Sequence, residues 1–293
     1  MKTKQKKKLK HKLALLAVII AAIALAFVVS GRIKTSEPEP QDPHEGMVEV
    51  FDGSSLTWIR PAEGMPVNPF TEEDFSCDEN GVPSFIGEGY ASFRGIDVSE
   101  YQGDIDWEQV KQSGIDFVIL RAGLRGYGIR GKLITDSRFT DNLAGAKAAG
   151  LKVGAYFFSQ AISGSEAIEE AKLALSLIDG EALDLPIYYD WEFVESNDAR
   201  TNDMNGPAIT DCALAFCETV ENAGYEAGIY SNVNLSYYYL DLGRLSDYAF
   251  WCAAPGDLPY SYYHSGMWQY SFRGSVPGIE TECDMDMMFV KYE

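Results

Sequence analysis

The chain has 293 residues, 46% of them hydrophobic and 13% aromatic, which is enough for one large domain with a core and some additional segments. Its formal net charge is −20, but residues 1–12 hold seven lysines and no acid, so 17 basic residues face 44 acidic residues in the remainder. Because nucleic-acid binding depends on neutralising phosphates, a body this acidic excludes nucleic acid as a partner.

An uncharged apolar run, Leu13 to Val29, follows the lysines. Its 17 residues are at the short end of what spans a bilayer and are long for the core of a signal peptide. We therefore expect residues 1–12 to be a cytoplasmic basic segment and residues 13–30 a transmembrane signal anchor, with the rest of the chain extracellular. A cleaved signal peptide and a secreted protein are the alternative, because Ala26 to Gly31 contains small residues.

Residues 31–46 mix proline with acidic residues and lack apolar periodicity, which predicts a disordered spacer. Residues 47–92 have short apolar segments broken by Gly, Pro and Asp, and we expect a small β-rich lead-in that packs on the main domain. From residue 93 to residue 293, short apolar runs alternate with amphipathic stretches, as in repeated β–α units around a parallel sheet.

The predicted strands of this region are 94–98, 117–122, 152–158, 186–192, 226–231, 249–253, 267–271 and 284–290, and the predicted helices are 106–113, 137–149, 165–179 and 207–223. After about residue 240 the helical pattern fades. We therefore predict an α/β fold, an irregular (β/α)8-like barrel with reduced helices in its second half, preceded by the anchor and the lead-in. An open Rossmann sheet is the competitor, but no GxGxxG follows the first predicted strand.

The five cysteines form no CxxC pair or Cys/His cluster, so we expect no metal and no cofactor. Cys252 and Cys283 each lie at the end of a predicted strand and are the one pair that we consider for a disulfide.

In barrels of this type the active site lies at the carboxyl ends of the strands, where Asp190-Trp191-Glu192 closes a predicted strand. Residues i and i+2 of a strand point to the same face, so the carboxyl groups of Asp190 and Glu192 should lie some 6–7 Å apart over one pocket, with Trp191 turned away. Two carboxyls in such a site tend to hold one proton between them, and glycosidic cleavage needs a protonated acid beside an ionised one.

Alternatives exist for each of these acids. A lone Asp-x-Glu is common, Asp97 could cap a turn, Asp284 could be a surface acid, and a carboxylate cluster could hold Mg²⁺ or Ca²⁺. His264 lies in a Tyr-rich loop and suits a surface position or a sugar contact better than the role of a base. No GxSxG elbow is present for Ser-His-Asp chemistry.

The segments RGIDVSEYQGDIDW (94–107), FVILRAG, VGAYFFS, PIYYDWE, AGIYSN, WQYS and DMDMMF resemble the family 25 glycoside hydrolases, which are lysozymes that cut peptidoglycan between N-acetylmuramic acid and N-acetylglucosamine. The resemblance covers about residues 93–293. It implies that Glu192 is the proton donor, that Asp190 stabilises or attacks the sugar cation, and that Asp97 and Asp284 complete the pocket. By the same resemblance, Tyr156, Tyr230, Trp268 and Gln269 line the saccharide groove.

The sequence departs from the common pattern of that family at two places. The family often has a histidine where Phe157 or Phe158 stands, and its last motif more often reads Asp-x-Asn than Asp284-Met-Asp286. The hypothesis is thus a membrane-tethered muramidase whose partner is the peptidoglycan glycan strand. A non-catalytic peptidoglycan-binding module on the same barrel is the alternative, and a metal-dependent phosphodiesterase would need His and Glu ligands at strand ends that the sequence lacks.

Overall fold

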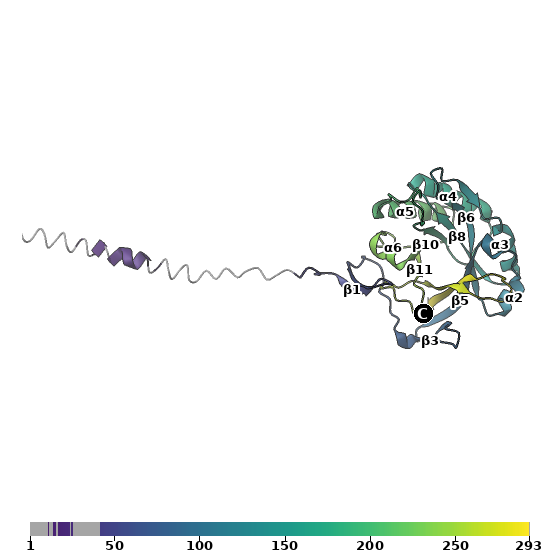
Figure 1. Cartoon of the computed structure of the whole chain (residues 1–293), viewed down its shortest axis with the longest axis horizontal. Helices are drawn as coiled ribbons and strands as arrows, with labels where there is room; N and C mark the ends of the chain where they lie inside the picture. Colours follow the sequence, from purple (N-terminus) through teal and green to yellow (C-terminus); the bar gives the residue numbers. More distant parts are fainter. Residues whose placement is uncertain (1–10, 12–13, 16, 24, 26–41, 293) are drawn as a thin grey trace, which may run out of the picture. The chain divides into compact units, whose positions relative to one another are not determined.

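The computed structural model describes residues 11, 14–15, 17–23, 25 and 42–292 (Figure 1), and the chain divides into two units, Met1–Glu45 and Gly46–Glu293. In the first unit, the described residues of the predicted anchor are helical and exposed. None of the described helices combines the length and the apolar character that a membrane span requires. Most of the predicted basic segment, the rest of the predicted anchor and residues 31–41 of the predicted spacer lie outside the described residues.

A closed eight-stranded barrel forms the centre of the second unit within residues 42–292. Its strands are β5 (Tyr90–Val98), β6 (Phe117–Arg125), β8 (Lys152–Ser159), β9 (Ile187–Trp191), β10 (Ala227–Asn232), β11 (Ala249–Ala253), β12 (Met267–Gly274) and β13 (Cys283–Lys291). The barrel closes because β5 pairs with β6 on one side and with β13 on the other. A short strand, β7 (Leu133–Thr135), is added antiparallel to β6. The eight strands predicted from sequence are thus all present, with ends shifted by a few residues.

The last strand departs from a regular (β/α)8 barrel. β13 runs antiparallel to both β12 and β5, whereas the other barrel pairs are parallel. Only residues 275–282 connect β12 to β13, and parallel strands need a crossover of a dozen or more residues. The chain therefore turns back on itself at this point.

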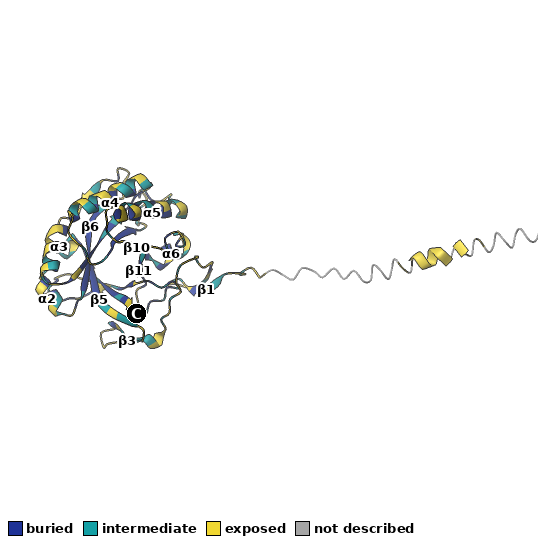
Figure 2. Cartoon of the chain, turned by 180° about the vertical axis from the view of Figure 1, so that it is seen from behind, coloured by how far each residue is buried: buried dark blue, intermediate teal, exposed yellow. Residues whose placement is uncertain are grey.

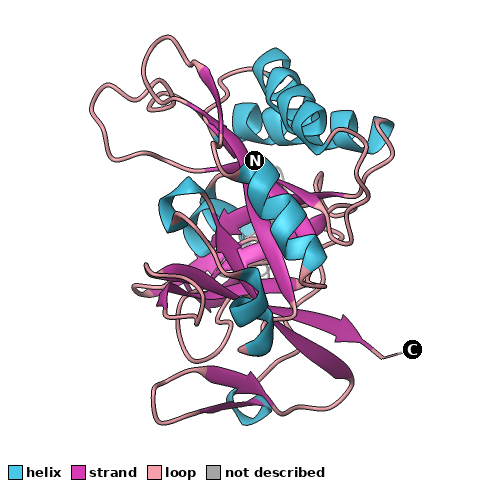
Figure 3. Ribbon diagram, turned by 90° about the vertical axis from the view of Figure 1, so that its right-hand side faces the viewer, coloured by secondary structure: helices cyan, strands magenta, loops and turns pink. Residues whose placement is uncertain are grey.

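The helices form an arc around the barrel, from α2 and α3 through α4 and α5 to α6 (Figure 1), and are drawn in cyan in Figure 3. They are α2 (Trp107–Gln112), α3 (Phe139–Ala148), α4 (Gly164–Ile178), α5 (Gly206–Asn222) and α6 (Val233–Tyr238), with short 3-10 turns η1 (Glu72–Asp74) and η2 (Glu100–Gln102). Ser163 and Asn205 cap the first turns of α4 and α5 by accepting a backbone N–H. Among the described residues no helix follows α6, in agreement with the fading helical pattern after residue 240.

Strand alternation gives the barrel two separate apolar clusters. Inward-facing residues such as Phe117, Ile119, Tyr188, Trp251 and Met267 fill the barrel below the site. Outward-facing residues pack against the helices and form the larger core. In Figure 2 the barrel strands are mostly dark blue, because residues on both of their faces are buried. Polar side chains that face inward near the carboxyl ends of the strands therefore lie at the mouth of the barrel.

The lead-in covers the side of the barrel that lacks helices. Its strands are β1 (Val48–Phe51), β2 (Leu56–Ile59), β3 (Phe75–Cys77) and β4 (Pro83–Phe85), which form two antiparallel pairs. Phe75 contacts Trp268 of β12 with ring centroids 5.5 Å apart, and Phe70 contacts Phe289 of β13 at 4.5 Å. The lead-in and the barrel belong to the same compact unit.

Two expectations about single residues are wrong. Cys252 and Cys283 are free thiols, because Cys252 lies on β11 and Cys283 on β13, with β12 between them. His264 is half-buried, and it precedes β12, so it lies away from the carboxyl ends of the strands where a sugar would be contacted. Its ring packs against Phe70 and Tyr90, at centroid distances of 5.4 and 5.6 Å.

Candidate active site

A pocket of about 100 Å³ lies inside the mouth of the barrel and contains the four acids that the sequence analysis singled out. Its lining residues come from seven strands or their ends. They are Asp97, Tyr156, Phe158, Asp190, Glu192, Tyr230, Trp251, Gln269 and Asp284. Each of these residues has the inward parity of its strand. Seven of the eight predicted site residues thus meet in one place.

Asp190 and Glu192 form the upper pair of the pocket. Asp190 ends β9 on the inward face and is 5% exposed, and Glu192 follows with the same parity and is partly exposed. Trp191 points to the outer core, where its Nε1 donates to the carbonyl of Ala161 at 3.1 Å. The parity prediction is therefore confirmed. The expected gap between the carboxyl groups is wrong, because the two side chains lean together into hydrogen-bonding contact.

This contact needs a proton, since two ionised carboxylates can only accept hydrogen bonds. Burial raises the pKa of Asp190 well above its usual range, and the contact and charge of Glu192 raise it further. Burial also raises the pKa of Glu192, although the contact with Asp190 lowers it and the charge of Asp284 raises it. The pair therefore titrates as a unit that keeps one proton between the two carboxyls.

Gln269 links the polar side chains on the other side of the pocket by hydrogen bonds. Its Nε2 donates to Asp97 Oδ2 at 2.7 Å and to Asp284 Oδ2 at 3.4 Å, while its Oε1 accepts from the hydroxyl of Tyr230 at 2.8 Å. Asp97 ends β5 and faces Asp284 across the β5–β13 pairing. A single amide thus orients two carboxyl groups and a phenol.

The protonation states of Asp97 and Asp284 also depend on burial. Burial raises the pKa of Asp284 to about 6. Burial and the neighbouring carboxyls of Asp286 and Asp284 raise the pKa of Asp97 well above its usual range. The Arg121 guanidinium of β6 acts in the opposite direction on Asp190, whose pKa it lowers.

Trp268 is the one predicted site residue that lies elsewhere. It alternates with Gln269 on β12 and therefore points outward, where it is fully buried and donates from Nε1 to the carbonyl of Ala254 at 2.8 Å. Trp251, from the inward face of β11, lines the pocket instead. The expectation that Trp268 lines the saccharide groove assigned it to the wrong face of the strand.

Asp286 is a buried acid that the sequence analysis did not assign to the site. It lies two residues after Asp284 on β13, so it shares the inward face, and its Oδ1 accepts from Trp251 Nε1 at 2.8 Å. The Asp-x-Asp spacing carried this signal, as it did for Asp190 and Glu192. Among the described residues no group of three or more His, Cys, Asp or Glu side chains has an arrangement that could hold a metal ion.

Comparisons with known proteins agree with this architecture. The profile of the Glycosyl hydrolases family 25 matches residues 96–279. The autolytic lysozyme of Clostridium acetobutylicum is 31% identical over 199 residues, which are 66% of this chain and 55% of that protein, so the chain spans about half the length of this relative.

Two solved structures share the fold. The modular autolysin LytC of Streptococcus pneumoniae superposes with a TM-score of 0.60 at 24% identity, over 84% of this chain and 57% of that one. The lysozyme of Streptomyces coelicolor does so with a TM-score of 0.53 at 26% identity, over 67% of this chain and 91% of that one. Because the profile match covers more than half of the chain and includes Asp97, Asp190 and Glu192, the chain belongs to glycosyl hydrolase family 25.

Proposed function

We propose that this protein is a muramidase that hydrolyses the β-1,4 bond between N-acetylmuramic acid and N-acetylglucosamine in peptidoglycan. The observation that carries the proposal is the contact between Asp190 and Glu192 in a pocket that also contains Asp97 and Asp284. Membership of family 25 and the relatives described as lysozymes support the choice of substrate.

Glu192 is the proposed proton donor because it lines the pocket and is the more exposed carboxyl of the pair. When the glycosidic oxygen enters, Glu192 donates the shared proton to the leaving oxygen. Asp190 is left ionised, next to the positive charge that develops on the sugar. A short separation of the two carboxyls favours a nucleophilic or acetamido-assisted route over inversion.

Asp97 and Asp284 are the proposed floor of the site, held in orientation by Gln269. Tyr156 and Tyr230 line the same pocket, and burial raises the pKa of both phenols, so they remain neutral hydrogen-bonding groups. A volume of about 100 Å³ is well below the roughly 300–1,000 Å³ of typical ligand pockets. The pocket therefore suits the reacting part of one sugar, with the rest of the strand lying across the mouth.

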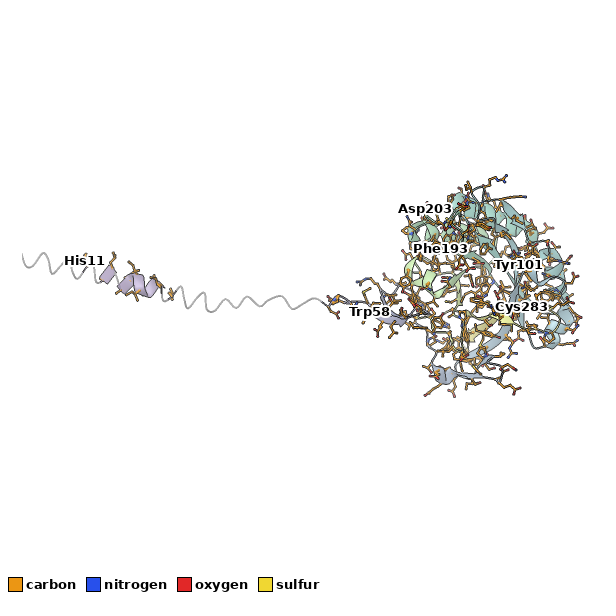
Figure 4. All side chains as sticks on the ribbon, viewed as in Figure 1. His11, Trp58, Tyr101, Phe193, Asp203 and Cys283 are labelled. Carbon is orange, nitrogen blue, oxygen red and sulfur yellow. The ribbon has the colours of Figure 1, made fainter. Side chains whose placement is uncertain are left out.

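Exposed aromatic rings follow the strands at this mouth. Tyr101 comes just after β5 and is 73% exposed, and Phe193 comes just after Glu192 and is 43% exposed (Figure 4). Phe193 also contacts Tyr239 with ring centroids 4.9 Å apart. Such rings are suitable platforms for sugar faces.

The experiment is digestion of purified peptidoglycan by the full-length chain, with Glu192→Gln as the matched variant and mass spectrometry of the new reducing ends. Reducing N-acetylmuramic acid ends from the wild type, reduced about 10²-fold or more in Glu192→Gln, are expected. Reducing N-acetylglucosamine ends would mean a different glycosidase. Binding without cleavage by either protein would leave a peptidoglycan-binding module.

We further propose that residues 13–30 anchor the protein in the cell membrane, with the barrel outside. The support is the uncharged run from Leu13 to Val29 directly after seven lysines. Membrane fractions of expressing cells should retain the full-length chain after a carbonate wash, and external protease should digest the barrel. Recovery of a shortened chain in the medium would identify a cleaved signal peptide instead.

A further inference from the structure

A second pair of carboxyl groups, Asp97 and Asp286, lies at the base of the proposed site. Asp286 comes from the inward face of β13 and pairs in register with Gly95, two residues before Asp97 on β5. The two side chains are in hydrogen-bonding contact, and they are 7% and 0% exposed. The pair is thus separate from Asp190–Glu192 and deeper.

The other contacts of this pair supply no positive charge. Asp286 Oδ1 accepts from Trp251 Nε1 and Asp97 Oδ2 accepts from Gln269 Nε2, while Asp286 Oδ2 is buried and accepts from no N–H or O–H group. Within the described ranges, neither acid forms a salt bridge with Lys or Arg. Two buried carboxyls that touch under these conditions need a proton between them.

We propose that Asp286 is a positioning residue that orients Asp97 through one shared proton, and that loss of this proton limits activity at basic pH. While the proton is present, the pair carries a single negative charge and Asp97 keeps its bond to Gln269. When the proton leaves, two adjacent anions repel each other at the base of the pocket. This inference rests on the proposed function, in which Asp97 takes part in hydrolysis.

The charged and titratable groups around the pair fit this role. They are Asp284 from β13, Cys283 beside it, Tyr156 from β8, Tyr188 from β9, Tyr230 from β10 and Tyr270 from β12. Burial raises the pKa of the four phenols and of the thiol, so they stay neutral. The carboxyls of Asp190 and Glu192 lie closer to the mouth of the barrel than the pair. The charge of Arg121 from β6 lowers the pKa of Asp190 and of Tyr156.

The pair also affects the stability of the fold, with a defined sign. Burial is the largest cause of the raised pKa of both acids, and the charge of Asp284 raises both further. The unfolded chain loses these protons near pH 4, where the folded chain keeps one. Stability from this source is therefore fully present below about pH 4 and is lost as the pH rises through the folded pKa.

Asp286→Asn is the decisive variant, because an asparagine can accept from Trp251 through its oxygen and donate to Asp97 through its nitrogen. Asp97 beside this amide has the same single charge as the protonated pair, but the amide has no proton to lose. In the full-length chain we expect kcat/KM on peptidoglycan close to wild type at acidic pH and a basic limb moved to higher pH. We also expect the free energy of unfolding in urea to depend less on pH above about pH 4.

Two further variants sharpen the test. Asp286→Leu removes the bond to Asp97 and should lower kcat more than it changes KM, and Asp203→Asn, an exposed acid, should leave the pH profile unchanged. An Asp286→Asn protein with the wild-type basic limb and the wild-type pH dependence of unfolding would overturn the proposal. If the wild type fails to cleave peptidoglycan, the muramidase assignment fails, while the unfolding measurement still decides whether the pair holds a proton.

Discussion

The side-chain amide of Gln160 donates a hydrogen bond of 2.7 Å to the backbone carbonyl of Glu192, the proposed proton donor. Gln160 directly follows β8 and is fully buried. Its Nε2 also donates to the carbonyl of Ser159, and its Oε1 accepts from the hydroxyl of Thr201 at 2.9 Å. Since Thr201 lies within the loop that leads from Glu192 to α5, one amide holds this loop at two positions.

Substitution Gln160→Ala should therefore reduce activity without removing any group from the pocket. The carbonyls of Ser159 and Glu192 and the hydroxyl of Thr201 lose a hydrogen-bond partner, which should lower the free energy of unfolding by about 1–3 kcal/mol. Displacement of Glu192 should lower kcat about tenfold or more, with a smaller change in KM. Steady-state kinetics and urea unfolding test this, with the exposed Gln112→Ala as control. A less stable variant with wild-type kcat would show that Gln160 supports the fold alone.

Asp284→Asn should change the pH profile of the enzyme in a defined direction. The pKa of Asp284 is about 6, so above this pH it is an anion. After burial, this charge is a further cause of the raised pKa of Glu192 and of Asp190. Since the charge of Asp284 also raises the pKa of Asp97 and of Asp286, both carboxyl pairs should lose their proton at lower pH without it. The basic limb of kcat/KM should therefore move to lower pH.

The magnitude and the control for this variant follow from its place in the pocket. We expect kcat to fall about 10²-fold as well, as for loss of one positioned acid. The residual activity suffices for a pH profile, and Asp203→Asn serves as the matched exposed control. A basic limb that stays in place or moves upward would contradict the electrostatic role of Asp284.

Trp268→Phe and Trp251→Phe are the same chemical change on opposite faces of neighbouring strands. Trp268→Phe leaves the buried carbonyl of Ala254 without its donor and should lower the free energy of unfolding by about 2 kcal/mol, with KM unchanged. Trp251→Phe removes the donor to Asp286 inside the pocket and should lower kcat/KM. A raised KM in Trp268→Phe at wild-type stability would instead show that Trp268 lines the saccharide groove.

Strand parity explains both what the sequence could predict and where its use fell short. It placed Asp190 and Glu192 inward and Trp191 outward, as the structure has them. The same rule places Trp268 on the opposite face of its strand from Gln269, and Asp286 on the same face as Asp284. The positions of Trp268 and Asp286 could therefore have been predicted from the sequence.

Other features have no such local signal. Contact between the carboxyls of Asp190 and Glu192 depends on side-chain torsions, which spacing along the strand does not determine. The antiparallel direction of β13 follows from a short connection whose length became known only with the strand ends. Which part of the chain covers the helix-free side of the barrel is decided by contacts between residues some 200 positions apart, such as Phe70 with Phe289.

The aromatic cluster of the lead-in is the clearest case of such long-range packing. Phe70 contacts four other rings besides His264, namely Phe75, Phe85, Tyr90 and Phe289. Phe75 in turn contacts Trp268, the outward neighbour of Gln269. The lead-in thus supports the strand that carries the amide between Asp97 and Asp284.

Phe70→Ala should therefore destabilise the barrel and not only the lead-in. Because Phe70 is half-buried, we expect the free energy of unfolding to fall by about 2 kcal/mol, less than the roughly 3–5 kcal/mol of a fully buried phenylalanine. Phe272→Ala, on β12 but 50% exposed, is the matched control and should cost well under half of that. Hydrogen exchange of β12 and β13 distinguishes the outcomes, since faster exchange there in Phe70→Ala means that the lead-in is part of the catalytic fold. Unchanged exchange in these strands, with only residues 47–92 exchanging faster, would mean that the barrel is stable without its lead-in.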